Sequence, residues 1–172
     1  MTAIRELCKT YSDDDIYNMD ETGLFWRSSP SSGLSTANIP GVKKDKARIT
    51  AAFCVNYSGN DRLNPWLIGK AKRPHSLRNV NCAGLGITWK YQSKAWMDSL
   101  IMKDWLQYFY NHIGSSRRVI LLLDNFSAHA SGIDLNPPPP NIYIQWLPPN
   151  ATSRYQPLDQ GIIQNVKVYY RR

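Results

Sequence analysis

The chain has 172 residues, of which 42% are hydrophobic, and this length is enough for one domain with a substantial core. Its formal net charge of +8 favours a polyanionic partner without identifying one, since basic proteins that bind no polyanion also exist. The three cysteines are too few and too widely spaced for a disulfide framework or a zinc motif, and no apolar run could span a bilayer, so we expect an intracellular protein with no membrane partner.

The first 93 residues predict a short helix followed by strands. In chain order, we expect a helix closed by a polar turn in 1–15, a strand at 16–21, a loop at 28–40, a strand at 49–57, its hairpin partner at 63–69 and a loop up to residue 93. Pro65 indicates that the hairpin partner is an edge strand or contains a bulge, because proline cannot donate to the ladder. The first strand ends in Asp20 and Glu21, which places two acids at its carboxyl end.

The rest of the chain predicts helices and strands in alternation. In chain order, we expect a helix at 94–113, a strand at 119–123, an extended linker that follows His129 and contains the prolines 137–140, a strand at 142–147, a turn at 148–153 and a last helix that 156–161 opens. The first of these helices has Ser93 as its expected N-cap and Gly114 as its stop. The strand Val119–Leu123 reads VILLL, which is typical of a strand buried on both faces of a sheet.

Three aspartates stand at the ends of these elements: Asp20, Asp124 and Asp159. Ligands of open α/β sheets collect outside the carboxyl ends of the strands, so Asp124 is well placed for chemistry. Carboxylates are the ligands that Mg²⁺ and Mn²⁺ prefer, and a pair of such ions can promote phosphodiester cleavage. Each acid also has a structural interpretation, since Asp124 can begin a turn and Asp159 can cap a helix. If the three converge, their mutual repulsion should raise their pKa values.

Two basic clusters flank the predicted hairpin. The first contains Lys43, Lys44, Lys46 and Arg48, and the second contains Lys70, Lys72, Arg73 and Arg78; all but Arg78 are the candidate DNA contacts. A solvated surface explains one such cluster, but two clusters beside the same hairpin favour a face that binds the phosphate backbone of DNA.

The chain contains the segments NMDETGLFW, LLLDNFSAH and LPPNATSRYQPLDQGIIQNVK. They resemble the three signature blocks of the DDE superfamily endonuclease domain in the pogo/Tigger branch of mariner-like transposases, which includes centromere protein B and the jerky proteins. The resemblance covers nearly the whole chain and implies an α/β, RNase H-like fold, in which helices flank a mixed central sheet. It also implies that Asp20, Asp124 and Asp159 are the catalytic triad and hold two Mg²⁺ or Mn²⁺ ions.

The same resemblance extends to supporting residues, partners and location. Asn125 and His129 match the second block and are candidates to orient a metal-bound water or a phosphate, although turn formation and packing also explain them. Gln156, close to Asp159, is a candidate of the same kind. The resemblance implies a nuclear protein that acts on DNA, and it allows a homodimer within a transposition complex.

Two functions stay open at this point. The three acids favour a metal-dependent endonuclease and strand-transfer core. An end inside the helix of Asp159 and the expected absence of the helix-turn-helix region favour a catalytically inactive or domesticated DNA-binding module. The prolines 137–140 stand where the family usually has a helix and are a further departure from its pattern. We expect residues 1–172 to form one DDE-type core, truncated at its C-terminus and without the family's helix-turn-helix region.

Overall fold

A six-stranded mixed sheet with helices on both faces forms the part of the chain that the computed structural model describes, residues 2–27, 47–148 and 156–170. The helices and strands are α1 (Thr2–Cys8), β1 (Ile16–Phe25), β2 (Arg48–Asn56), β3 (Trp66–Gly69), β4 (Thr88–Tyr91), α2 (Ser99–Ile113), β5 (Val119–Leu123), α3 (Ser127–Leu135), β6 (Ile142–Trp146) and α5 (Ile162–Tyr170). Short 3₁₀ turns are η1 (Asp13–Asp15), η2 (His75–Leu77) and η3 (Pro157–Asp159). None of the described helices is long and apolar enough to cross a membrane.

The strand order is β4-β3-β2-β1-β5-β6, and it leaves part of β1 open at one edge. β1 and β2 are antiparallel, as are β2 and β3, whereas β5 is parallel to both β1 and β6. β1 pairs with β2 from Tyr17 to Phe25 but with β5 only from Ile16 to Asn18. Beyond Asn18, therefore, no described strand pairs with this edge of β1.

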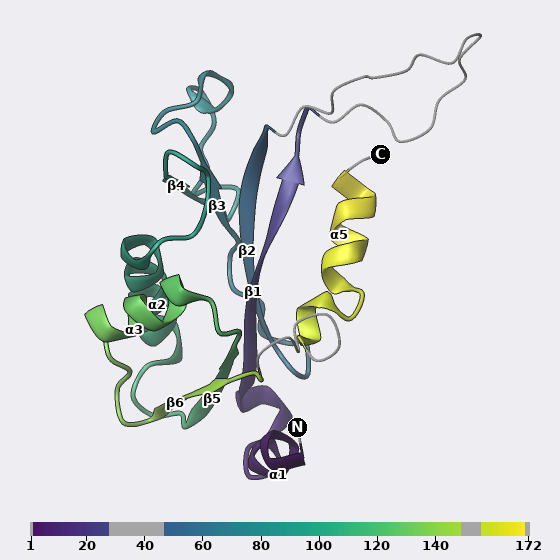
Figure 1. Ribbon diagram of the computed structural model, residues 1–172, viewed down its shortest axis with the longest axis vertical. Helices are drawn as coiled ribbons and strands as arrows, with labels where there is room; N and C mark the ends of the chain where they lie inside the picture. Colours follow the sequence, from purple (N-terminus) through teal and green to yellow (C-terminus); the bar gives the residue numbers. More distant parts are fainter. Residues whose placement is uncertain (1, 28–46, 149–155, 171–172) are drawn as a thin grey trace, which may run out of the picture.

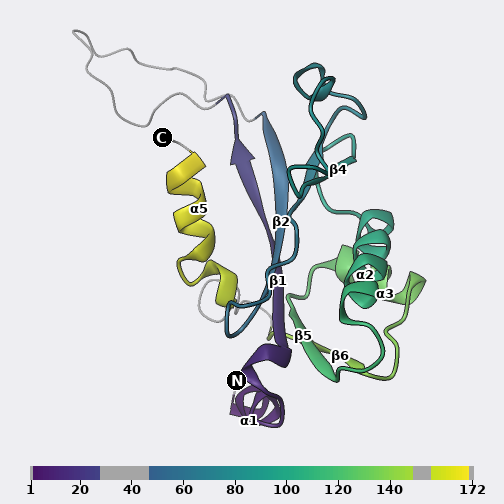
Figure 2. The ribbon, with the colours of Figure 1, turned by 180° about the vertical axis from the view of Figure 1, so that it is seen from behind.

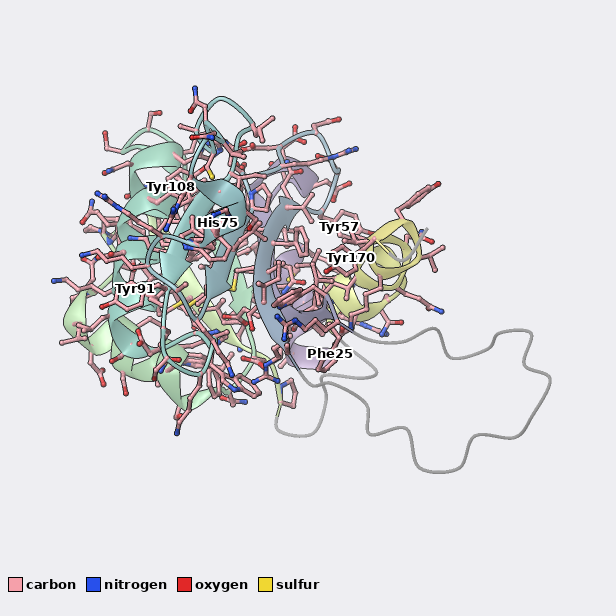
Figure 3. All side chains as sticks on the ribbon, turned by 90° about the horizontal axis from the view of Figure 1, so that it is seen from above. Phe25, Tyr57, His75, Tyr91, Tyr108 and Tyr170 are labelled. Carbon is pink, nitrogen blue, oxygen red and sulfur yellow. The ribbon has the colours of Figure 1, made fainter. Side chains whose placement is uncertain are left out.

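Alternating side chains divide the core into two layers. Val119, Leu121 and Leu123 pack on the side of α2, whereas Ile120 and Leu122 pack on the side of α1. The strand VILLL is thus buried on both faces, as predicted. Figures 1 and 2 show α2 and α3 together on one face of the sheet and α5 on the other. Figure 3 shows the same separation from above, with Tyr108 of α2 and Tyr170 of α5 on opposite sides of the sheet.

The long helix starts later than its periodicity predicts. α2 begins at Ser99, and Asp98 rather than Ser93 is its N-cap, because the Asp98 carboxylate accepts a hydrogen bond from the backbone N–H of Ile101 at 2.9 Å. The preceding residues instead form a turn in which the Ala95 N–H donates to the Gln92 carbonyl. Gly114 ends the helix with a φ of 69°, as predicted.

The predicted edge strand lies inside the sheet. β4 pairs in parallel outside β3, and it forms within a stretch that we expected to be a loop. β4 escaped prediction because its four side chains are half-buried or exposed, so it has no buried apolar run. Pro65 precedes the first residue of β3 and therefore leaves its ladder intact.

A helix also occupies part of the predicted extended linker after His129. α3 runs to Leu135, so the prolines 137–140 follow the helix and do not replace it. α3 packs closely against α2: a Cβ at Gly132 would lie 2.5 Å from Met102 Cγ. This contact fixes α3, and hence His129, against the body of the domain.

Candidate active site

Asp20 and Asp124 occupy equivalent positions on neighbouring parallel strands. The ladder joins Asn18 to Leu122, and the same register places Asp20 opposite Asp124, which is one residue beyond β5. Neighbouring strands lie about 4.8 Å apart, so the pairing of β1 with β5 up to Asn18 and Leu122 brings the following segments, which carry Asp20 and Asp124, near each other. The prediction that Asp20 ends its strand was wrong, because β1 continues along β2 to Phe25. It lies in the middle of β1, where the edge of the strand is open.

A buried asparagine attaches the segment of Asp159 to the same place. The Asn18 side chain accepts a hydrogen bond from the Leu158 N–H at 3.0 Å and donates one to the Leu122 carbonyl at 3.0 Å. The Gln156 side-chain amide donates to the Met19 carbonyl, also at 3.0 Å. Asn18 therefore joins β1, β5 and η3, and η3 carries Asp159 at its last residue.

One cleft, with a volume of 270 Å³, contains the three aspartates. It is also lined by Glu21, Thr22, Gly23, Arg48, Thr50, Trp96, Met97 and Phe126. Acids that the sequence separates widely thus face a common space, with one arginine among them.

The aspartates differ in their ionisation. Burial, followed by the negative charges of Asp159, Glu21 and Asp124, raises the pKa of Asp20 to about 8. Burial would also raise the pKa of Asp124, but hydrogen bonding and the charge of His129 lower it below its ordinary value. The expectation of raised pKa values is therefore confirmed for Asp20 and wrong for Asp124.

His129 is a fully buried cation between two carboxylates. Its Nδ1 lies 2.8 Å from Asp124 Oδ1, and its Nε2 lies 2.9 Å from Glu21 Oε1. Burial opposes a charge on the ring, but hydrogen bonds and charges from Asp124 and Glu21 outweigh burial and raise the pKa of His129 to about 10. His129 therefore holds Asp124 in place and compensates two of the acids near the cleft.

The other two candidates for support contact the backbone. The Asn125 side-chain amide donates to the Leu147 carbonyl, which joins the chain after β5 to the chain after β6. Gln156 is fully buried and contacts Met19, next to Asp20. Both residues stabilise the backbone around the cleft.

The donor atoms of the cleft suit a hard cation. Among the described residues, no three Asp, Glu, His or Cys side chains converge closely enough to hold a metal ion as they stand. The three aspartates nevertheless supply carboxylate oxygens, which Mg²⁺ and Mn²⁺ prefer, around one space. Besides burial, the negative charges of Asp159, Glu21 and Asp124 raise the pKa of Asp20, and a divalent cation would offset these charges.

Of the basic clusters, Arg48 is the one described residue that lines this cleft. Lys43, Lys44 and Lys46 fall outside the described residues. Arg48 lines both the acidic cleft and a neighbouring groove of 760 Å³, which Lys70 also lines. Lys72 and Arg73 line a further groove of 560 Å³ and are exposed.

Sequence reasoning missed three residues of this region: Asn18, Glu21 as the partner of His129, and Trp96. Asn18 carried a signal, because it is a polar residue inside the otherwise apolar run IYNM. Trp96 carried none, since it lay within the predicted helix and only the later start of α2 exposes it.

The sequence of this chain is similar to a known protein family and to several individual proteins. Residues 46–172 match the family described as DDE superfamily endonuclease. The whole chain is 35% identical to CENP-B homolog protein 2 of Schizosaccharomyces pombe and spans 34% of that protein. Over 88% of its length, it is 34% identical to the human Jerky protein homolog. Over 91% of its length, it is 30% identical to human Tigger transposable element-derived protein 7. It spans 28% and 31% of those two proteins.

Solved structures share the fold. The Mos1 mariner paired-end complex with Mn aligns with 98% of this chain and 46% of the Mos1 chain, at a TM-score of 0.58 and 13% identity. The Mos1 strand transfer complex aligns with 98% of this chain and 45% of its own, at a TM-score of 0.57 and 14% identity. The predicted RNase H-like fold is thereby confirmed.

Proposed function

Because this chain belongs to the DDE superfamily endonuclease family, in the branch of CENP-B homologs, Jerky proteins and Tigger-derived proteins, we propose that it is a metal-dependent DNA endonuclease and strand-transfer core. Its catalytic residues are Asp20, Asp124 and Asp159. The observation that carries this proposal is their shared cleft, which three separate parts of the chain build. The chain spans about a third of the relatives' length, so the proposal concerns the chemistry of this domain.

Asp20, Asp124 and Asp159 would hold two Mg²⁺ or Mn²⁺ ions. Such ions activate a water or hydroxyl nucleophile and stabilise the leaving oxygen of a phosphodiester. The protein's own contribution is positional. His129 fixes Asp124 through its Nδ1, and Asn18 fixes the turn that carries Asp159.

DNA is the proposed substrate, and the basic residues beside the cleft are its proposed contacts. Arg48 lines the acidic cleft itself, and Lys70, Lys72 and Arg73 lie on neighbouring grooves. Lys43, Lys44 and Lys46 complete the proposed set. Contacts of this kind neutralise phosphates and hardly distinguish sequences, so binding should weaken steeply with salt. A DNA substrate and the eukaryotic relatives together favour the nucleus as its location.

Two observations favour the alternative, a DNA-binding module without catalysis. His129 already engages Asp124 and Glu21, and no three described acidic, histidine or cysteine side chains converge on one point. A cleft whose charge is partly compensated in this way could bind DNA and leave it intact. The alternative predicts DNA binding without metal-dependent cleavage.

Nicking of supercoiled plasmid separates the two functions. With Mn²⁺, the wild-type chain should nick plasmid, and EDTA should stop the reaction. Asp124→Asn should lower the rate by roughly a hundredfold or more, because it removes a charged metal ligand. Asp104→Asn is the matched control, since Asp104 is an exposed aspartate of α2 that binds Lys90 outside the cleft. Wild-type protein that binds plasmid without nicking it would reject catalysis and support the module.

A further inference from the structure

Two exposed aromatic side chains share the cleft with the three aspartates. Trp96 is 47% exposed and Phe126 is 37% exposed, and both line the cleft. Burial of a large aromatic side chain is favourable, so two exposed ones at an acidic cleft suit a ligand with an aromatic face. Neither side chain is used by the chemistry proposed above.

Trp96 is paired with the arginine of the cleft. The Arg48 guanidinium carbon lies 3.8 Å from the centre of the Trp96 ring, which is the geometry of a cation–π contact. Arg48 begins β2, so this contact connects the chain before α2 to the sheet. The pair places a flat ring and a positive charge together at the cleft that contains the acids.

The backbone next to Trp96 is held in an unfavourable conformation. Ala95 has a φ of 54°, in the left-handed region that alanine rarely adopts, and its side chain is fully buried. The Thr50 hydroxyl donates to the Ala95 carbonyl at 2.6 Å, and the Ala95 N–H donates to the Gln92 carbonyl at 2.7 Å. Strained residues of this kind persist where the surrounding structure fixes them, and they are concentrated at ligand sites. Here the two hydrogen bonds of Ala95 fix the chain immediately before Trp96.

Phe126 is linked directly to the acids. Its backbone N–H donates to Asp124 Oδ1 at 3.2 Å, and its ring packs edge-on against His129 with 5.4 Å between ring centroids. The ring therefore has a fixed position relative to Asp124. A base that stacks on Phe126 or Trp96 would have its phosphate close to the aspartates.

We propose that Trp96 and Phe126 form a subsite for an unpaired nucleotide beside the phosphodiester on which the aspartates act, and that Arg48 contacts its phosphate. This inference rests on the proposed function and specifies its substrate as DNA with a frayed or single-stranded end. Bases in an intact duplex are stacked on one another, so their faces are unavailable to the protein. An unpaired base can stack on an aromatic side chain whatever its sequence.

The test compares a short blunt duplex with the same duplex carrying an unpaired 3′ extension that contains 2-aminopurine, whose fluorescence falls on stacking. Ca²⁺ is present as a hard divalent cation, and binding is measured by anisotropy. The wild-type chain should bind the extended duplex roughly tenfold more tightly and quench the probe. Trp96→Ala should abolish both effects, whereas Trp96→Phe should keep most of each.

Trp26→Ala is the matched control. Trp26 is 52% exposed and lies 4.5 Å from the Arg27 guanidinium carbon, but it lines the neighbouring groove and not the acidic cleft. Its removal should leave the preference for the extended duplex unchanged. Circular dichroism and melting temperature should match among the variants, and quenching by the wild type and Trp96→Phe gives an independent result if Trp96→Ala is poorly folded.

Three results would overturn the inference. A wild-type chain that binds both duplexes equally has no subsite for an unpaired base. A Trp96→Ala variant that loses affinity equally for both duplexes shows that Trp96 only supports backbone contacts. A wild-type chain that binds neither duplex, even at low salt, rejects the proposed function as well, and this distinguishes the two failures.

Discussion

Replacement of Asp20 by asparagine should stabilise the metal-free protein at neutral pH. Asparagine has nearly the same shape and can still accept the hydrogen bond from the Glu21 N–H, which is 2.8 Å from Asp20 Oδ1. It carries no charge. The native carboxyl is only 5% exposed, and burial together with the charges of Asp159, Glu21 and Asp124 raises its pKa to about 8.

The direction of this stability change follows from the linkage between proton binding and folding. The unfolded carboxyl loses its proton near pH 3.8, but the folded carboxyl keeps it until about pH 8. The wild-type free energy of unfolding therefore falls between these pH values and is level above them. At pH 7, about 3 pH units above the unfolded pKa, the cost has a ceiling of about 4 kcal/mol. Even about 1 kcal/mol raises the Tm of a chain of this size by about 2–4 °C.

Urea and thermal unfolding of the wild type and Asp20→Asn, in EDTA, measure this cost. The advantage of the variant should be absent near pH 4, grow toward pH 8 and then become constant. If the three aspartates bind the metal, millimolar Mg²⁺ should stabilise the wild type more than Asp20→Asn, because the variant lacks one of the carboxylates. Asp104→Asn, at an exposed site, should show no such growth. A variant that is less stable than the wild type at every pH would refute the reasoning.

Three further substitutions test other parts of the structure. His129→Gln should lower the free energy of unfolding by about 3–5 kcal/mol at pH 6, because it leaves two carboxylates without their cation. The pKa of His129 is raised from 6.5 to about 10, so this loss should shrink as the pH rises from 6.5 to about 10 and then stay level; a pH-independent loss in urea unfolding would contradict this. Asn18→Ala leaves the Leu158 N–H unpaired, so it should lower the free energy of unfolding by about 2–4 kcal/mol. It should also weaken metal binding, because the turn that carries Asp159 is released. Unchanged metal affinity in calorimetry would oppose the role assigned to Asn18. Lys72→Ala should weaken binding to all duplexes alike and lower the salt slope by about one unit, as measured by anisotropy, and a sequence-selective loss would argue against phosphate contact.

Strands with a strong apolar signal were predictable. Val119–Leu123 is buried on both faces and appears where its composition placed it, and β1, β2 and β6 begin within one residue of their predicted starts. These strands form mainly through burial of apolar side chains, and the apolar pattern is visible in the sequence itself. β4 depends on a ladder with β3 and buries little, so no local pattern reveals it.

The sequence predicted that the three aspartates lie close together, and they line one cleft, but it did not predict which residues contact them. Asp124 directly follows the buried strand Val119–Leu123, and the apolar run of that strand is recognisable in the sequence. The compensation of its charge by His129 depends on the packing of α3 on α2, a tertiary contact through Gly132 that no local pattern encodes. The turn before α2 likewise includes a tertiary contact, the hydrogen bond between Thr50 and Ala95, which are far apart in the sequence.

Calorimetric titration of Mn²⁺ into the wild type and Asp124→Asn tests the central proposal most directly. If Asp20, Asp124 and Asp159 hold the metal, the wild type should bind about two ions per chain, and the variant should lose at least one of them. Equal binding by both proteins, or no binding by the wild type, would contradict the assignment of this cleft as a metal-dependent active site.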